Sequence, residues 1–432
     1  MSSQPLRLGL AGLGTVGIGV VKILEREAAL VAARSGRPVV ITAVSARDRA
    51  KNRDADLSAF AWETDPVALA TRDDVDVFVE VMGGHEGPAK AATEAALAAG
   101  KHVVTANKAL LAHHGQALAE AAEARGVALR FEAAVAGGIP VIKALTEGLA
   151  GNRIKRVMGV MNGTCNYILT RMQAAGLPYQ TVFEEARQLG YLEADPNLDV
   201  GGIDAGHKLS LLSSIAFGTR VAFDAVELEG IGNVSIDDIN LADDMGYHIK
   251  LLGVAQMTGR GLEQRMTPCL VPAESPLGQL QGGTNMVVLE GDSVGQIVLR
   301  GPGAGMGPTA SAVMGDVIDI ARGFVRPVFG IPATQLTPAV PARAATPAPY
   351  YLRMALLDKP GALAKIATCL GEAGISIDQM RQINREDQED DDAIVLIVTH
   401  KASPADIEHA LSQFSQTGVL VDRPVAIRIE EV

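Results

Sequence analysis

The chain has 432 residues, too many for one ordinary hydrophobic core, so we expect two or three domains. Its formal net charge of −12 argues against nucleic acid or an anionic membrane surface as the main partner. The three cysteines lie far apart, and no apolar run reaches the roughly 18 residues that a membrane span needs. We therefore expect a cytoplasmic, soluble protein with neither a disulfide framework nor a cysteine metal site.

The first third of the chain alternates between short β-type runs and alanine-rich helical stretches. Strands are expected at 6–12, 38–44, 75–81 and 101–107, and helices at 17–34 and 86–100. Alternation of this kind, with nearly continuous apolar strands, is typical of an α/β domain with a doubly wound parallel sheet covered on both faces. We assign residues 1–137 to this domain.

The pattern changes from residue 138 onward. A helix is expected from Ile139, with further helices before residue 217 and strands at 248–257, 286–291 and 295–301. Helices followed by strands predict an α+β second domain over 138–300. A glycine-rich turn and a helix then follow, and residues of about 301–325 could return to complete the first domain.

Residues 337–349 hold several prolines and alanines without periodicity, which predicts an extended linker. Residues 350–432 then follow the order β-α-β-β-α-β, with strands at 350–356, 375–382, 393–399 and 424–430. This order is the ferredoxin-like arrangement.

A glycine motif directly follows the first expected strand. Gly12-x-Gly14-x-x-Gly17 opens the first helix, with Thr15 and Val16 inside the motif. Gly12 permits a tight turn, Gly14 lets the backbone approach a pyrophosphate, and Gly17 lets the helix pack on the sheet. In its βαβ context the motif predicts dinucleotide binding.

The second strand normally ends in an acid that binds the ribose hydroxyls of NAD. Here it is followed by the basic run from Arg47 to Arg53, which suits the 2′-phosphate of NADP. Asp48 keeps NAD possible, and an ordinary solvated loop is the alternative. We expect NADP or NAD, with Arg47 near the ribose.

Two lysines are candidates for chemistry. Lys108 lies at the carboxyl end of an expected parallel strand, the edge where ligands bind in such sheets, although helix capping would also explain it. Asp204 and Lys208 are four residues apart on one helix face, after the acid-rich stretch 193–199. A surface ion pair is the simple explanation. Alternatively, the acids keep Lys208 protonated as a proton donor to a carbonyl reduced by hydride.

Residues 186–208 resemble the signature of homoserine dehydrogenase. The matching positions are Ala186, Gly190, Asp195, Pro196, Asp199, Gly202, Asp204 and Lys208. "TANKALL", "FEAAVAGGIP", "GVMNGTCNYIL" and "GPGAGMGPTASAVMGD" resemble further segments of that family in the same order, whereas Leu192 replaces a usually small residue. Residues 350–432 resemble an ACT domain, a small module that senses amino acids.

The resemblance implies roles for the acids and lysines. Lys208 would donate the proton, and Glu193, Asp199 and Asp204 would arrange the substrate ammonium, the lysine and a water. Lys108 would be a second catalytic or substrate-contacting lysine at the cofactor crevice.

The resemblance also implies ligands along the backbone. Gly303 and Gly305 would close over the nicotinamide. A structural sodium ion would bind at positions matching the family's site, largely through backbone carbonyls: Glu132, Val135, Gly137 and Ile139.

The implied activity is NAD(P)H-dependent interconversion of L-aspartate 4-semialdehyde and L-homoserine, on the route to threonine and methionine. The implied assembly is a homo-oligomer, a dimer or tetramer, joined through the sheet of the second domain. L-threonine is the expected effector of the ACT domain, and an oligomerisation role for that domain is the alternative. Two alternatives to this assignment are another amino-acid dehydrogenase with an ACT domain and a catalytically silent amino-acid sensor. No kinase-like region precedes residue 5, so we expect no fused aspartokinase.

Overall fold

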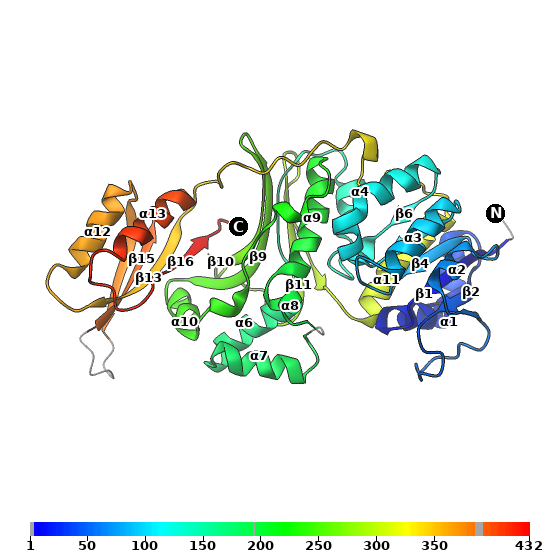
Figure 1. Ribbon diagram of the computed structural model, residues 1–432, viewed down its shortest axis with the longest axis horizontal. Helices are drawn as coiled ribbons and strands as arrows, with labels where there is room; N and C mark the ends of the chain where they lie inside the picture. The colour runs from blue at the N-terminus through cyan, green and yellow to red at the C-terminus, as the bar shows by residue number, and fades with distance from the viewer. Residues whose placement is uncertain (1–3, 193–194, 385–391) are drawn as a thin grey trace.

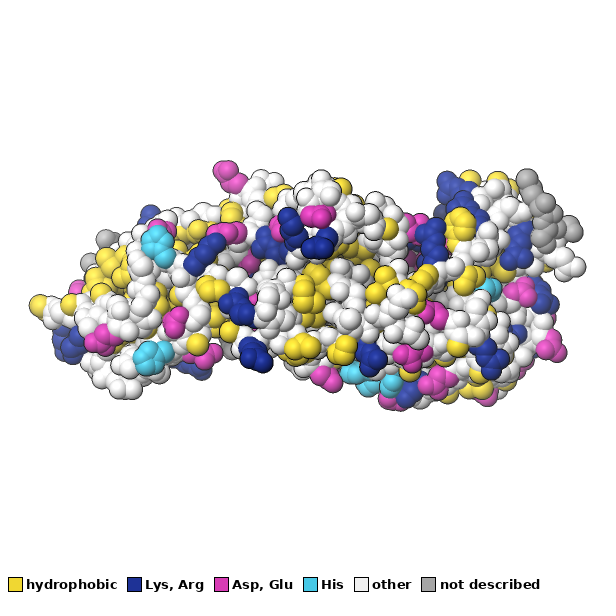
Figure 2. All heavy atoms as spheres, turned by 90° about the horizontal axis from the view of Figure 1, so that it is seen from above, with side chains coloured by type: hydrophobic (Ala, Val, Ile, Leu, Met, Phe, Trp, Pro, Cys, Tyr) yellow, Lys and Arg dark blue, Asp and Glu magenta, His cyan; other side chains and the backbone are white. Residues whose placement is uncertain are grey.

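The computed structural model describes residues 4–192, 195–384 and 392–432. Three lobes lie in a row along the longest axis, with the N-terminal domain at one end and the C-terminal domain at the other (Figure 1). Acidic and basic side chains are interspersed over the face seen from above (Figure 2). Over the described part of the chain, no helix has the length and apolar character required to cross a membrane.

The N-terminal domain has a six-stranded parallel sheet in the order β3-β2-β1-β4-β5-β6, which confirms the doubly wound α/β prediction. Its strands are β1 (Leu6–Ala11), β2 (Val39–Ser45), β3 (Ala61–Glu63), β4 (Val77–Glu80), β5 (His102–Thr105) and β6 (Leu129–Arg130). Its helices are α1 (Thr15–Ser35), α2 (Pro66–Thr71), α3 (Pro88–Ala98) and α4 (Lys108–Ala124). Helix α11 (Met306–Ala321) returns to this domain and packs on α1, with Ala310 against Gly19.

The middle domain combines a mixed sheet with helices. Its strands are β7 (Ile154–Val160), β8 (Glu227–Leu228), β9 (Tyr247–Thr258), β10 (Gly261–Pro272), β11 (Thr284–Gly291) and β12 (Gly295–Pro302). Its α-helices are α5 (Val141–Lys143), α6 (Gly163–Ala175), α7 (Tyr179–Gln188), α8 (Asn197–Val200), α9 (Ile203–Phe217) and α10 (Ile236–Asp244). The short helices are η1 (Glu132–Ala134), the π-helical η2 (Ala144–Gly148), η3 (Phe223–Ala225), η4 (Ile231–Asn233) and η5 (Ala333–Gln335). The helix expected from Ile139 begins at Val141 and continues as η2.

Helix α9 packs tightly on the sheet of the middle domain, and most of its residues are buried as a result. Ala205 to Ser214 are all buried, and Leu209 packs toward Gly253 of β9. This packing fixes the helix that carries Asp204 and Lys208 between the sheet and the N-terminal domain.

The C-terminal domain has the sheet order β16-β13-β15-β14, which confirms the ferredoxin-like prediction. Its elements are β13 (Tyr350–Leu357), α12 (Ala362–Glu372), β14 (Ile377–Asn384), β15 (Asp392–Thr399), α13 (Pro404–Phe414) and β16 (Val425–Ile429). Tyr350, Ile366 and Phe414 belong to a hydrophobic core of this domain.

The sheets of the middle and C-terminal domains are joined into one ten-stranded sheet. Strand β16 pairs in parallel with β10 through Cys269 with Arg428 and Leu270 with Ile429. The extended segment before the C-terminal domain is also attached to β10, since Leu262 donates to Val340 O over 2.8 Å. The chain thus crosses the middle domain along β10 before it enters the last domain (Figure 1).

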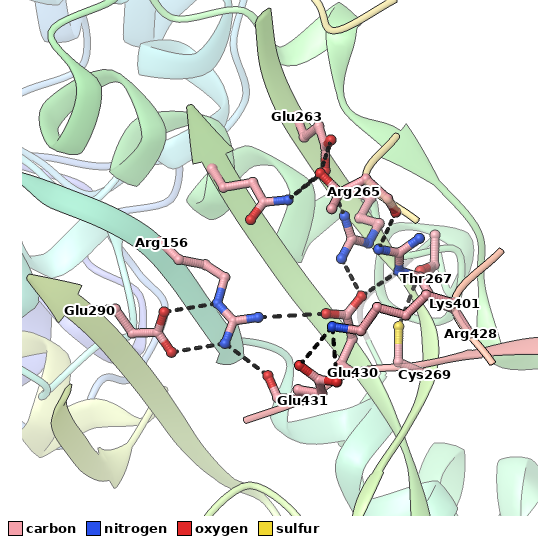
Figure 3. A network of polar contacts seen from close by, with 12 residues as sticks. Arg156, Glu263, Arg265, Thr267, Cys269, Glu290, Lys401, Arg428, Glu430 and Glu431 are labelled. Atoms are coloured by element: carbon pink, nitrogen blue, oxygen red, sulfur yellow. Dashed lines mark hydrogen bonds and ion pairs between the residues drawn. The ribbon is translucent and has the colours of Figure 1, made fainter. Parts of the chain in front are cut away.

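Buried and partly buried ion pairs reinforce this junction (Figure 3). Arg265 of β10 pairs with Glu430, which also accepts a 2.5 Å bond from Arg428. Arg156 of β7 pairs with Glu290 at 2.8 Å and donates to the backbone oxygen of Glu431 at 2.8 Å. The buried charges of Arg265, Arg428 and Glu430 need such partners, so these contacts fix the position of β16.

Candidate active site

A cleft of about 1010 Å³ lies between the carboxyl ends of the parallel strands and the middle domain. In open parallel sheets this edge is where ligands bind. Nine of the residues predicted for the site line this cleft: Thr15, Val16, Lys108, Gly137, Asp199, Asp204, Lys208, Gly303 and Gly305. The fold therefore brings together residues from both domains that lie far apart in the sequence.

The turn between β1 and α1 has the geometry expected of a pyrophosphate site. Gly12 has φ of 103°, and a Cβ atom on it would lie 2.6 Å from the carbonyl oxygen of Val81. A Cβ on Gly17 would lie 2.0 Å from the Gly12 oxygen, whereas one on Gly14 would meet no atom within 4 Å. Gly14 is the N-cap of α1 without a side-chain cap, so the first amides of the helix are available to phosphate oxygens.

The tip of β2 carries no acid. The strand ends at the buried Ser45, whose carbonyl accepts a hydrogen bond from Gly12 N. Arg47 follows as an exposed side chain outside the cleft lining. Arg49 and Arg53 lie over the Trp62 ring, with guanidinium carbons 5.7 and 5.6 Å from its centroid. Basic side chains therefore surround the segment that follows β2.

Asp204 joins the two candidate lysines across the domain boundary. Its Oδ2 lies 2.6 Å from Lys208 Nζ, and its Oδ1 lies 2.8 Å from Lys108 Nζ. Burial alone would raise the pKa of Asp204, but the two ammonium groups lower that pKa well below its usual range. The Asp204 and Lys208 side chains are only 9% and 10% exposed, so the simple surface ion pair is ruled out.

Lys208 is held in a defined position by a second bond. Its Nζ donates to the backbone oxygen of Met161 over 2.8 Å. An ammonium held by one carboxylate and one carbonyl keeps a third N–H, which can point to a ligand oxygen. Because Lys208 lines the cleft, a bound molecule can reach this group.

A buried network that sequence reasoning missed positions Lys108. Glu80, fully buried at the end of β4, accepts a 2.6 Å bond from Thr105 Oγ1 and a 2.7 Å bond from Met82 N. Thr105 Oγ1 accepts from Asn107 N over 2.9 Å, and Asn107 caps the helix that begins at Lys108. Burial raises the Glu80 pKa. A carboxyl residue closing an apolar strand was the only sequence signal for this network.

Asp199 also lines the cleft. It is 4% exposed and accepts a 3.0 Å bond from Asn162 Nδ2, while Asn162 Oδ1 caps helix α6. Glu193, predicted to bind the substrate, lies outside the described residues. Asp199 and Asp204 thus supply two negative charges to the described part of the cleft.

Imidazole rings form another wall of the cleft that was not anticipated. His207, between Asp204 and Lys208, packs on Phe223 with ring centroids 4.2 Å apart, and His113 lies 5.5 Å from His207. Burial, followed by repulsion from His113, lowers the pKa of His207 to about 4. The His207 ring is therefore neutral at physiological pH and presents an apolar face with polar edges to the cleft.

The four residues predicted to bind sodium are buried and lie on one turn, of which Gly137 lines the cleft. Each oxygen of the Glu132 carboxylate accepts one backbone N–H, from Ile142 and Lys143, both over 2.9 Å. Burial and the neighbouring Asp316 raise the pKa of Glu132 to about 8. Each carboxylate oxygen keeps a free lone pair. Hard oxygen donors beside two close acids fit a small alkali cation.

Two observations bear on which groups would bind a cation at this turn. Ala136 and Gly137 have φ of 55° and 53°, an unusual pair that turns the backbone between Val135 and Ile139. No group of three or more His, Cys, Asp or Glu side chains suited to a metal ion exists among the residues that the structure describes. A cation at this turn would therefore depend on Glu132 and backbone carbonyls, as the sequence resemblance implies.

The fold and this cleft define an NAD(P)-dependent oxidoreductase whose cleft is lined by the buried pair of Asp204 and Lys208. Family profiles match the description "Homoserine dehydrogenase, NAD binding domain" over residues 12–132 and "Homoserine dehydrogenase" over 140–318. A third profile, "ACT domain", matches residues 350–418.

Individual relatives agree over almost the full length. The homoserine dehydrogenase of Pseudomonas aeruginosa is 42% identical over 443 residues, covering 99% of this chain and 100% of the relative. That of Neisseria gonorrhoeae is 43% identical over 437 residues, covering 99% of each. The crystal structure of a homoserine dehydrogenase from Thiobacillus denitrificans has a TM-score of 0.93 at 39% identity, covering 100% of this chain and 99% of that one.

The chain belongs to the homoserine dehydrogenase family and carries a C-terminal ACT domain. The family assignment expected from the sequence is therefore confirmed.

Proposed function

We propose that the cleft reduces L-aspartate 4-semialdehyde to L-homoserine with NADPH, and catalyses the reverse oxidation, as a step in threonine and methionine biosynthesis. The observation that carries this proposal is the bridge from Lys108 through Asp204 to Lys208 at the dinucleotide cleft. A carbonyl that accepts hydride develops negative charge on its oxygen, and a positioned ammonium both stabilises that charge and supplies the proton.

Lys208 is the proton donor in this mechanism. The nicotinamide cofactor supplies the hydride when it is bound. Lys208 Nζ transfers its proton to the aldehyde oxygen as the C–H bond forms, and Asp204 keeps the ammonium oriented. Lys108, whose side chain is 30% exposed, contacts the substrate from the N-terminal domain and is a route for reprotonation. Gly303 and Gly305 line the cleft, and we assign to them the contact with the nicotinamide.

The acids select an amino-acid substrate. Asp199 and Glu193 bind the α-ammonium group of aspartate semialdehyde, and Asp204 completes the negative lining. Support for this assignment comes from the buried position of Asp199 beside Asn162 at the cleft wall. A neutral aldehyde without an ammonium group should then be a poor substrate.

NADPH is the proposed cofactor, with NADH accepted. The exposed Arg47 and the arginines stacked on Trp62 provide positive charge near the end of β2, where no carboxylate stands. A homoserine dehydrogenase from a hyperthermophilic archaeon, 25% identical with a TM-score of 0.64, was solved in complex with NADPH. That likeness supports the choice for this chain.

Sodium is the proposed structural ion at Glu132, Val135, Gly137 and Ile139. The ion would offset repulsion between Glu132 and Asp316 and hold the turn beneath the cleft. Thermal unfolding in sodium chloride and in choline chloride at equal ionic strength tests this proposal. A midpoint that is the same in both salts would contradict it.

L-threonine is the proposed effector of the ACT domain, and a dimer or tetramer is the proposed assembly. The cytoplasmic location expected from the sequence stays a prediction. Light scattering that returned a mass near 45.1 kDa at micromolar concentration would contradict the oligomer.

One experiment tests the central proposal. NADPH and NADH oxidation are followed after addition of aspartate semialdehyde to the full-length protein, with and without threonine. We expect turnover with both cofactors and a decrease with threonine. If neither NADPH nor NADH supported turnover, the proposed reaction would be refuted. If millimolar threonine left the activity unchanged, the proposed role of threonine as effector would be refuted.

A further inference from the structure

A second cleft, of about 970 Å³, lies at the junction of the middle and C-terminal domains. Its walls are the segment 227–234, the linker residues 342–345, helix α13 and strand β16. No described residue lines both this cleft and the dinucleotide cleft. It is therefore a separate cavity between the catalytic part of the molecule and the ACT domain.

The pairing along β10 explains why a cleft forms there. The outer edge of β10 pairs with β8 at Arg265 and Met266, and with β16 at Cys269 and Leu270. Between these two pairings, Thr267 and Pro268 line the cleft. The cleft thus separates a strand of the catalytic domain from a strand of the ACT domain, on the edge of one shared strand.

Charged side chains of both signs face this cleft without ion-pair partners among the described residues. The acids are Glu227 and Glu229 of the catalytic domain and Glu408 of α13, and the basic groups are Arg343 and Arg423. The buried Arg265 and Arg428 behind them are different, because Glu430 pairs with both (Figure 3). The charges on the walls are therefore available to a ligand.

The two acids on β8 and just after it favour a cation. Partial burial, and then repulsion from Glu227, raise the pKa of Glu229. An ammonium group placed between them would offset this repulsion. The arginines supply the complementary site for a carboxylate.

We propose that this cleft binds a small zwitterionic amino acid, with its ammonium on Glu227 and Glu229 and its carboxylate on the arginine side formed by Arg343 and Arg423. The inference rests on the proposed function, in which an amino acid regulates the enzyme, and it locates the effector at the domain junction. The ligand contacts strands from both domains, so it can stabilise one arrangement of the junction over another.

The acid-bearing segment 227–230 packs against the turn that joins Asp199 to Asp204. Glu229 N donates to Met266 O over 3.0 Å. A Cβ on the next residue, Gly230, would lie 2.3 Å from the carbonyl oxygen of Val200 and 2.8 Å from the Cα of Gly201. Close packing of this kind transmits small shifts, because there is no free space to absorb them.

The turn at Val200 and Gly201 lies between Asp199 and Asp204, the two acids of the active site. A ligand that moves Glu229 and Gly230 would therefore displace the substrate-binding acids, while the glycine turn at Gly12 is not involved. We expect the ligand to raise the KM for aspartate semialdehyde and to leave the NADPH dissociation constant within about twofold. A raised KM together with an unchanged NADPH dissociation constant would indicate that the ligand acts through the turn at Val200 and Gly201.

The test uses the full-length protein with L-threonine as the probe. Threonine binding is measured by calorimetry and its inhibition by steady-state kinetics, for wild type, for the double variant Glu227→Gln with Glu229→Gln, and for Arg423→Gln. Glu274→Gln with Glu372→Gln is the matched control, since both acids are exposed and lie outside the cleft. N-acetyl-L-threonine, which lacks the ammonium group, is the control ligand.

We expect the threonine dissociation constant to rise at least tenfold in the double variant and in Arg423→Gln, with kcat and KM in the absence of threonine within twofold of wild type. The control variant should match wild type, and the acetylated ligand should not bind. Undiminished inhibition of the double variant would overturn the proposal and locate the effector elsewhere, such as between paired ACT domains.

Two further outcomes separate this inference from the proposed reaction. No measurable threonine binding to an enzyme that turns over aspartate semialdehyde overturns the inference and leaves the reaction standing. Threonine binding that is lost in the double variant, in a protein without turnover, supports the cleft and refutes the reaction.

Discussion

Replacing Lys208 with methionine removes the ammonium group from the active site and keeps a side chain of similar length. In the native protein this ammonium bonds Asp204 and the oxygen of Met161, at 2.6 and 2.8 Å. The lysine side chain is only 10% exposed, so bulk water has little access to replace the lost donor. The substitution therefore tests the proton-donor role with little change in packing.

The expected fall in kcat depends on the proton donors that remain in the Lys208→Met variant. Loss of a positioned proton donor typically lowers rates by about 10² to 10⁴. Lys108 stays within 2.8 Å of Asp204 and can partly replace the donor. We therefore expect kcat to fall by about a hundredfold to a thousandfold, or about 2.7 to 4.1 kcal/mol in activation free energy.

The assay is steady-state NADPH oxidation with aspartate semialdehyde, together with NADPH binding measured by fluorescence. NADPH affinity should stay within about twofold of wild type, because the β1–α1 turn is unchanged. Lys101→Met is the matched control: Lys101 donates to Val75 O over 2.6 Å at the opposite end of the sheet, and its loss should leave kcat nearly unchanged. If Lys208→Met kept more than half the wild-type rate, or Lys108→Met lost more activity than Lys208→Met, the assignment of the proton donor would be wrong.

Three other predictions follow from the cofactor site and the buried charges. NADPH should have a kcat/KM at least equal to that of NADH, and a tenfold preference for NADH would contradict the role given to the basic side chains after β2. Gly17→Ala should lower the thermal unfolding midpoint, because its Cβ would lie 2.0 Å from the Gly12 oxygen. Gly14→Ala should keep the midpoint and raise the KM for NADPH, because its Cβ would meet no atom within 4 Å. Equal midpoints for the two variants would be inconsistent with this geometry. Burial lowers the pKa of Lys250 from 10.5 to about 8, so the unfolded chain holds the extra proton between these values and wild-type stability should gain about 1.4 kcal/mol per pH unit there, relative to Lys250→Met. Unfolding midpoints of the two proteins measured from pH 8 to 10 check the sign, and a difference independent of pH would exclude it.

Local pattern and spacing predicted most of the fold. The glycine motif and the strand–helix alternation predicted the parallel sheet, and the βαββαβ order predicted the ferredoxin-like fold of the C-terminal domain. Strand β10 was missed because Glu263, Gln264 and Arg265 are polar and Pro268 interrupts the run. Glu263 and Arg265 are buried in this strand with partners from elsewhere in the chain, Gln256 of β9 and Glu430, and the segment 261–272 alone does not reveal those partners.

The candidate site was predicted in part for a similar reason. The four-residue spacing placed Asp204 and Lys208 on one helix face, and the structure places them in contact. That Lys108 would reach the same carboxylate from another domain depends on domain packing, which local periodicity does not encode. The Glu80 network depends on two neighbouring strands and is invisible in either alone.

The pairing of β16 with β10 also affects how the protein is made. Strand β10 ends near residue 272, and its β16 partners Arg428 and Ile429 follow roughly 160 residues later. At about 5–20 residues per second, a ribosome needs roughly 8–30 s to add that stretch. During that interval the edge of β10 at Cys269 and Leu270 has no β16 to pair with, and Arg265 lacks Glu430. An open strand edge invites pairing with other chains. A nascent or shortened chain without β16 should therefore be prone to aggregation, and its loss of activity would report misassembly as well as loss of regulation.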